Sequence, residues 1–157
     1  MADNVGTAVV GVGFVGGQAH VPAFKKIEGS NLVAICDIAE DRVKPLAKKY
    51  DVPYYLDYEK LLEDDKVEAV MLSLPTPLHY GMAMQAIKKG KHVLCEMPIA
   101  ATIEQTKELG KAAEEAGVVL MPNLNFRFAP IYAKIKEMIK AGAIGKPIAL
   151  HFREFIP

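Results

Sequence analysis

Short apolar runs alternate with helix-like patterns along nearly the whole chain. Runs rich in Val, Ile and Leu, without polar alternation, are typical of strands that helices cover on both faces. Six such runs predict strands, at Thr7–Val12, Asn31–Asp37, Pro53–Tyr55, Val67–Ser73, His92–Cys95 and Val118–Met121. Apolar residues at helical spacing predict the intervening helices, at Gly16–Ile27, Glu40–Tyr50, Tyr58–Asp64, Pro77–Lys89 and Ile103–Ala116. The alternation predicts an α/β fold built on a Rossmann-type doubly wound parallel sheet.

Local signals place several helix ends. Thr102-Ile103-Glu104-Gln105 has the spacing of a capping box, so we expect a helix to begin there. Gly90 and Gly117 are expected to end helices. Pro45 interrupts the second helical pattern, so that helix either starts late or kinks.

A glycine-rich turn, G-x-G-x-x-G, lies between the first predicted strand and helix. Gly11 permits the tight turn, Gly13 lets the backbone approach a pyrophosphate, and Gly16 allows close packing of helix on strand. Phe14 and Val15 complete the turn, and the N–H groups that open the next helix favour phosphate. Asp37 follows about 20 residues later, where a carboxylate can accept hydrogen bonds from a ribose. The turn therefore predicts a dinucleotide site, with a purely structural turn and a solvated acid as the alternatives.

The expected strand order, 3-2-1-4-5, locates this site more closely. Right-handed crossovers place strand 1 beside strand 4, and ligands bind at the carboxyl ends of strands where the order reverses. Four segments should converge there: Gly11–Gly16, Ser73–His79, Cys95–Pro98 and Asn123–Arg127. Beyond the turn and Asp37, the residues expected to contact the cofactor are Ser73, Leu74, Thr76, His79, Glu96 and Asn125.

Composition narrows the range of functions. The 157 residues suit one domain with a sizeable core, and 51% hydrophobic with 24% charged residues is ordinary for a globular protein. Nineteen basic and nineteen acidic side chains cancel, so we expect neither nucleic acid nor a membrane surface as a partner. The start of the chain has no signal-peptide pattern, which predicts a cytoplasmic protein. Cys36 and Cys95 should lie three strands apart as free thiols, and no Cys or His spacing indicates a metal site.

These segments together resemble the glucose-fructose oxidoreductase/inositol dehydrogenase/rhizopine-catabolism (Gfo/Idh/MocA) family of NAD(P)-dependent oxidoreductases. The matching stretches are Gly11–Gly16 with His20-Val21-Pro22-Ala23, Thr76-Pro77-Leu78-His79, Gly90–Pro98, Asn125-Phe126-Arg127-Phe128 and Gly142–Gly145. The resemblance implies a dinucleotide-binding domain over residues 1–125. It assigns residues 126–157 to a connecting helix and the first strand of a truncated substrate domain. The implied reaction is hydride transfer between nicotinamide and a sugar, cyclitol or related hydroxyl or carbonyl carbon.

Two departures from the family pattern bear on activity. The family usually has Glu-Lys-Pro where this chain has Glu96-Met97-Pro98, and a thioether has neither the charge nor the proton donor of lysine. The Asp and His that the family supplies from its second domain are also missing. We therefore expect no hydride transfer by this chain alone, and a small polyol or sugar-like substrate only with a second domain. A non-catalytic NAD-binding or sensing module is the alternative, and a methyltransferase that uses S-adenosylmethionine fits poorly.

The remaining candidates carry two interpretations each. Thr76 and Pro77 are expected as cap and first turn of a helix, and His79 either lines the site or lies on the surface. His20 and His92 are interpreted as structural, with no obvious charge partner for either. By resemblance Glu96 points toward the ribose of the nicotinamide half, with a surface acid as the alternative. Because no Arg or Lys follows Asp37 before Arg42, NAD is favoured over NADP.

The end of the chain predicts an unpaired strand. After a helix at Pro130–Lys140, alternate apolar residues Ile148, Leu150 and Phe152 would share one face of a strand. Such a strand exposes unpaired backbone groups and an apolar row. We therefore expect residues 148–156 to be disordered or docked on a second copy, which would make a homo-oligomer.

Overall fold

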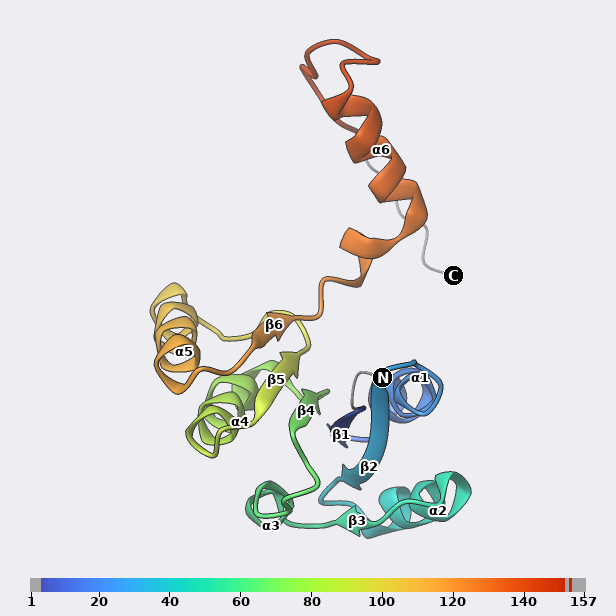
Figure 1. The fold of residues 1–157 in the computed structure, drawn as a ribbon, viewed down its shortest axis with the longest axis vertical. Coiled ribbons are helices and arrows are strands. Elements are labelled where there is room, and N and C mark those ends of the chain that lie inside the picture. Colours follow the sequence, from blue (N-terminus) through green and yellow to red (C-terminus); the bar gives the residue numbers. More distant parts are fainter. Residues whose placement is uncertain (1–3, 152, 154–157) are drawn as a thin grey trace. The chain divides into compact units, whose positions relative to one another are not determined.

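The computed structural model describes residues 4–151 and residue 153, and this part of the chain contains one six-stranded parallel sheet in the order β3-β2-β1-β4-β5-β6 (Figure 1). The strands are β1 (Val5–Val10), β2 (Ser30–Cys36), β3 (Tyr54–Tyr55), β4 (Ala69–Leu72), β5 (His92–Cys95) and β6 (Leu120–Pro122). The predicted doubly wound sheet and its strand order are confirmed, with β6 added beside β5. β1 lies between β2 and β4, so the order reverses where it was expected to.

The helices alternate with the strands as predicted. They are η1 (Gly16–His20), α1 (Val21–Phe24), α2 (Glu40–Tyr50), α3 (Tyr58–Leu62), α4 (Thr76–Lys88), α5 (Ile103–Ala116), η2 (Asn125–Phe128) and α6 (Pro130–Lys140). The first helix differs from its prediction because it includes a π-helical turn and ends at Phe24 rather than Ile27. The second begins at Glu40 with Pro45 inside it, so the expected late start is wrong.

Two apolar layers enclose the sheet because successive side chains of a strand point to opposite faces. Ala8 and Val10 of β1 belong to the core under α3, α4 and α5, whereas Val9 belongs to the core under α1 and α2. Figure 1 shows these two groups of helices on opposite faces of the sheet. Both faces are covered, which explains why the strands read as continuous apolar runs.

Thr102 and Gly117 lie at the helix ends where they were predicted, whereas Thr76 does not. The Thr102 hydroxyl accepts from the Gln105 N–H at 3.2 Å, and Gly117 closes α5 at φ 66°. Thr76 is not the cap expected for α4, because Pro75 occupies that position in an extended conformation and the helix begins at Thr76. The proline ring fixes φ near the −59° found here, and proline has no side-chain acceptor, so no side chain caps the first N–H groups of α4.

The chain divides into two compact units, Met1–Asn123 and Leu124–Pro157. In the second unit η2 leads into α6, and the rings of Phe126 and Tyr132 pack 5.6 Å apart. Residues 148–151 have no regular structure and no partner strand within the described chain, so the strand predicted near the end stays a prediction. Phe152 and residues 154–156 of that prediction lie outside the described residues.

No helix within residues 4–151 is long and apolar enough to cross a membrane.

Candidate functional site

The residues that directly follow five strands meet at one edge of the sheet. The strand register pairs Cys36 with Val10, Val10 with Leu72, and Leu72 with Cys95. Backbone hydrogen bonds continue one residue further, from Gly11 N to Cys36 O at 2.8 Å and from Glu96 N to Leu72 O at 3.0 Å, for example. The residues held in this row are Gly11, Asp37, Ser73, Glu96 and Asn123. The sheet itself thus brings the first three predicted segments and Asn123 together at its carboxyl edge.

Two glycines of the turn are required by the protein's own packing. Gly11 has φ 83°, a conformation that favours glycine, and a Cβ there would collide with the carbonyl oxygen of Ser73. A Cβ at Gly16 would collide with the carbonyl oxygen of Gly11, so the helix can pack against β1 only without a side chain. Packing within the protein is therefore sufficient to explain why Gly11 and Gly16 are glycines, and these two residues give no information about a ligand.

Gly13 is different. An added Cβ at Gly13 would meet no protein atom within 4 Å, and its φ is not in the left-handed region. Neither packing nor backbone strain requires glycine here. A pyrophosphate that approaches the start of the helix closely would account for glycine at this position of the turn. The turn therefore fits a dinucleotide.

Asp37 is fixed by the turn that it faces. One carboxylate oxygen accepts from the Val12 N–H at 2.8 Å and the other from the Ala39 N–H at 2.9 Å, while only 8% of the residue is exposed. The Arg42 guanidinium lies 3.5 Å away. An ionised carboxylate has about four acceptor positions, so the acid can still accept from a ligand. The alternative interpretation, that Asp37 is an acid surrounded by solvent, is therefore wrong.

A pocket of about 420 Å³ opens beside Asp37. Its lining is largely apolar and includes Ile38, Leu56, Pro75, Leu78 and Met82, together with Gly11, Gly13, Ser73 and Leu74. A planar, apolar part of a ligand with polar atoms at its edge would fit this lining, because small-molecule sites are mostly apolar with a few precisely placed polar groups. Four more of the predicted residues thus line one cavity with Asp37, namely Gly11, Gly13, Ser73 and Leu74.

His79 is buried, with 1% of its surface exposed, so its surface alternative is wrong. Nδ1 lies 2.7 Å from the Pro98 carbonyl oxygen and Nε2 lies 2.7 Å from the Leu74 carbonyl oxygen. Both ring nitrogens are therefore occupied by the protein. The ring connects the loop after β4 to the loop after β5 rather than offering an atom to a ligand.

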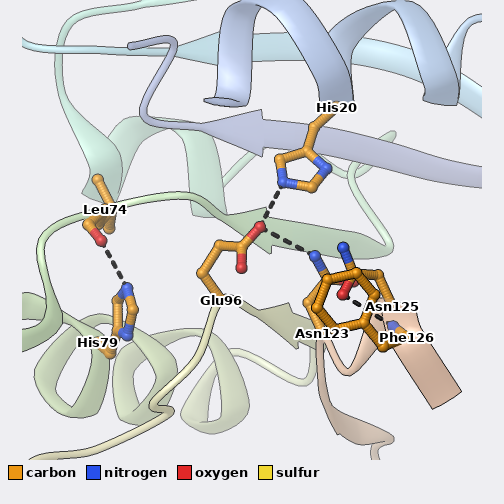
Figure 2. A network of polar contacts seen from close by, with 7 residues as sticks. All are labelled: His20, Leu74, His79, Glu96, Asn123, Asn125 and Phe126. Atoms are coloured by element: carbon orange, nitrogen blue, oxygen red, sulfur yellow. Dashed lines mark hydrogen bonds and ion pairs between the residues drawn. The ribbon is translucent and has the colours of Figure 1, made fainter. Parts of the chain in front are cut away.

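Glu96 lies at the centre of a small polar network (Figure 2). His20 donates from Nε2 to Glu96 Oε1 at 2.7 Å, and Asn123 donates from Nδ2 to the same oxygen at 2.9 Å. The side chains of His20 and Glu96 are 14% and 27% exposed. The surface-acid alternative for Glu96 is wrong, and so is the expectation that His20 has no charge partner.

Met97 follows Glu96, and 51% of its surface is exposed. Its thioether cannot donate a proton, so the position offers apolar surface where the family resemblance places an ammonium group. Phe14 and Val15 are exposed on the turn, and Thr76 is half-buried in the first turn of α4. Asn125 belongs to the second unit, where its side-chain oxygen accepts from the Phe126 N–H at 2.8 Å.

The two thiols are free and buried, as predicted. Cys36 ends β2 and Cys95 ends β5, three strands apart in the sheet. Burial raises the pKa of both thiols to about 12. They are therefore neutral core residues. Within residues 4–151 and 153, no three His, Cys, Asp or Glu side chains gather as metal ligands.

Sequence reasoning missed the roles of His20 and Asn123. The segment that begins at Asn123 was predicted to reach the carboxyl edge, but the hydrogen bond from Asn123 to Glu96 was not predicted. The contact of His20 depends on the π-helical turn, in which the Val21 N–H bonds to the Gly16 carbonyl. A regular helix has a different periodicity, so the pattern gave no signal for this partner.

Comparison with known proteins agrees with this geometry. The model of the family described as oxidoreductases with an NAD-binding Rossmann fold matches residues 5–124. The myo-inositol 2-dehydrogenase of Thermotoga maritima is 34% identical over 143 residues, which are 90% of this chain and 42% of that protein. The scyllo-inositol 2-dehydrogenase (NAD(+)) of Bacillus subtilis is 32% identical over 149 residues, which are 94% of this chain and 44% of that protein.

Solved structures show the same relation. A 3-ketoreductase from Actinomadura kijaniata in complex with NADP and TDP-benzene superimposes with a TM-score of 0.85 at 30% identity, over 92% of this chain and 44% of that one. A probable dehydrogenase from Thermotoga maritima gives a TM-score of 0.85 at 33% identity, over 91% and 43% of the two chains. The chain thus spans less than half the length of each of these relatives. It belongs to the oxidoreductase family with an NAD-binding Rossmann fold, which is the Gfo/Idh/MocA family that its motifs resemble.

Proposed function

We propose that this chain binds NAD(H) at the carboxyl edge of its sheet, as the coenzyme-binding part of an oxidoreductase. The observation that carries the proposal is the open space at Gly13, since no protein atom lies within 4 Å of an added Cβ. The pyrophosphate would lie on the turn from Gly11 to Gly16, where the first helix presents its free N–H groups. A bound nicotinamide would supply or accept the hydride.

The adenosine ribose would bind Asp37, with the adenine in the apolar pocket beside it. The hydrogen bonds from the Val12 and Ala39 N–H groups hold the carboxylate in one orientation. A 2′-phosphate at this point would meet that carboxylate, so we favour NAD over NADP. Arg42, 3.5 Å from Asp37 and with a largely exposed side chain, is the group that would lessen this preference.

Hydride transfer needs more than this chain offers. Met97 cannot assist proton transfer to or from a substrate oxygen, which is worth about 10²–10⁴-fold in general acid–base catalysis. In the arrangement implied by the family, residues 1–125 bind the coenzyme and residues 126–157 lead into a second domain that binds the substrate. Two of the relatives are named inositol dehydrogenases. A cyclitol, sugar or similar polyol is accordingly the proposed substrate class of a longer protein.

A non-catalytic NAD-binding module is the second candidate function, and Met97 favours it. The side chain is half exposed beside Glu96, in the position where the resemblance expects lysine. A protein that senses or stores the dinucleotide has no use for a proton donor there. In this case Met97 is part of an intact binding site rather than a defect.

Calorimetric titration of the chain with NADH and with NADPH tests the cofactor. We expect binding of both with tighter binding of NADH, and no binding of either would refute the proposal. Oxidation of NADH is then followed with a panel of keto-inositols and keto-sugars. Binding without turnover is expected for the chain alone. Joining a substrate domain separates the two candidates, because only the oxidoreductase should then turn over.

A further inference from the structure

Glu96 is held by its backbone and by its side chain. Its N–H donates to the Leu72 carbonyl at 3.0 Å, which fixes the residue at the end of β5. Asn123 is fixed in the same way, because its N–H donates to the Cys95 carbonyl at 2.7 Å. The Asn123 amide therefore reaches Glu96 Oε1, 2.9 Å away, from a rigid part of the sheet.

His20 contacts the same oxygen from the helical segment that follows the glycine turn. It is the last residue of the π-helical turn η1, which is closed by the bond from Val21 N to Gly16 O. π-helical turns are rare and occur frequently at functional sites. Here the irregular turn lies next to the phosphate-binding segment and ends with the one side chain that contacts Glu96 from this helix.

Both donors use Oε1 and leave the second oxygen, Oε2, available. Among the described residues no hydrogen bond reaches Oε2, and Figure 2 shows it pointing away from His20 and Asn123. A carboxylate has about four acceptor positions, so this oxygen can accept two hydroxyl donors. Vicinal hydroxyls of a ribose form such a pair of donors.

We propose that His20 and Asn123 are positioning residues that fix Glu96 so that Oε2 accepts from the ribose on the nicotinamide side of a bound dinucleotide. This inference rests on the proposed NAD(H) site and extends it to residues that do not themselves contact the ligand. Without its two donors, Glu96 would have to be ordered when the ligand binds. Ordering one long side chain costs about 0.5–1.5 kcal/mol, equivalent to a 2- to 10-fold loss of affinity.

Three ligands of increasing length locate the effect along the dinucleotide. ADP carries the adenosine and pyrophosphate only, ADP-ribose adds the second ribose, and NADH adds the nicotinamide. The variant His20→Ala should bind ADP-ribose and NADH about 2- to 10-fold more weakly and ADP as the unmodified chain does. His20→Gln should restore much of the affinity, because the Gln amide can also donate to Oε1.

A double-mutant cycle shows whether His20 acts through Glu96. Once Glu96→Ala has removed the carboxylate, adding His20→Ala should cause no further loss of NADH affinity. His92→Ala is the matched control, because His92 also makes a structural hydrogen bond, in which its Nδ1 accepts from Val119 N–H at 2.9 Å, at the opposite end of β5. That variant should bind all three ligands normally.

Nitrogen NMR of the free chain gives a readout without any ligand. The His20 Nε2–H should be slow to exchange in the unmodified chain and should become fast in Glu96→Ala. Equal weakening of ADP and NADH by His20→Ala would overturn the inference, as would independent losses in the double-mutant cycle. If NADH binds normally to Glu96→Ala, this inference fails while the proposed function stands. If the unmodified chain does not bind NADH, the proposed function itself fails.

Discussion

A methyl group at Gly13 tests the position of the pyrophosphate most directly. Gly13→Ala adds one Cβ into a space where no protein atom lies within 4 Å, so nothing in the folded chain has to move. Replacing glycine by alanine where the backbone permits it stabilises a protein by about 0.4–1 kcal/mol, through the unfolded state. The variant should therefore be as stable as the parent or melt about 1–4 °C higher.

Ligand binding should change in the opposite direction. The added methyl would occupy the space through which the phosphates approach the turn, and overpacking of this kind costs about 1–3 kcal/mol. That range corresponds to roughly 5- to 150-fold weaker binding of NADH. A more stable protein that binds its cofactor less well is a combination that general damage to the fold cannot produce.

Calorimetric titration with NADH and a thermal melt, performed on the same preparation, measure both effects. Gly110→Ala is the matched control, since Gly110 also has no atom within 4 Å of an added Cβ but lies inside α5. It should gain stability and keep its affinity for NADH. Unchanged NADH binding in Gly13→Ala would refute the reasoning, because the phosphates would then have to lie elsewhere.

Four further predictions concern other parts of the chain. Asp37→Asn should weaken NADH and narrow its advantage over NADPH, and calorimetry showing equal binding of both by the parent would contradict the role of Asp37. Met97→Lys should give no NADH oxidation by the chain alone. In a longer version with a substrate domain, the same change should raise the rate of NADH oxidation by about 10²–10⁴-fold. An unchanged rate in the longer version would mean that another group already transfers the proton. Burial raises the pKa of the Cys36 and Cys95 thiols to about 12, so a thiol reagent at mildly alkaline pH should label them only after denaturation. The unfolded thiols ionise above their ordinary pKa of 9.0 while the folded ones stay protonated, so the free energy of unfolding should fall as the pH rises from there toward 12. Light scattering should show less self-association when residues 147–157 are removed, and a full chain that stays monomeric while amide exchange protects this segment would contradict the prediction.

The fold could be predicted well because the sheet is covered on both faces. Burial on two sides produces apolar runs without alternation, and β5 was predicted with the bounds that the structure shows. The helices that cover the sheet have apolar residues at helical spacing, and α2 and α5 were also predicted with their observed bounds. Element ends were missed where local chemistry competes with the pattern. Pro75 rather than Thr76 precedes α4.

The site was predictable where a residue's role follows from backbone geometry. Gly11, Asp37 and Glu96 each follow a strand, and parallel strands place such residues at one edge. The partners of these groups were not predictable, because His20 and Glu96 are 76 residues apart and meet only through an irregular turn. The strand expected near Ile148 has no partner strand within the described residues and stays a prediction, since backbone groups of a strand need a neighbouring strand to pair with.

The buried ring of His79 limits which sequences can occupy this fold. Its two ring nitrogens each lie 2.7 Å from a carbonyl oxygen, that of Leu74 on one side and that of Pro98 on the other. A neutral imidazole donates from one nitrogen at a time, so either tautomer serves one of the two carbonyls. Asparagine and glutamine carry their two donor hydrogens on a single nitrogen, so neither can reach both oxygens at once. An apolar replacement would remove the contact to both part-buried carbonyls and disconnect the loop after β4 from the loop after β5. An engineer changing the cofactor or substrate preference of this chain can therefore vary the loops around position 79 and keep the histidine that joins them.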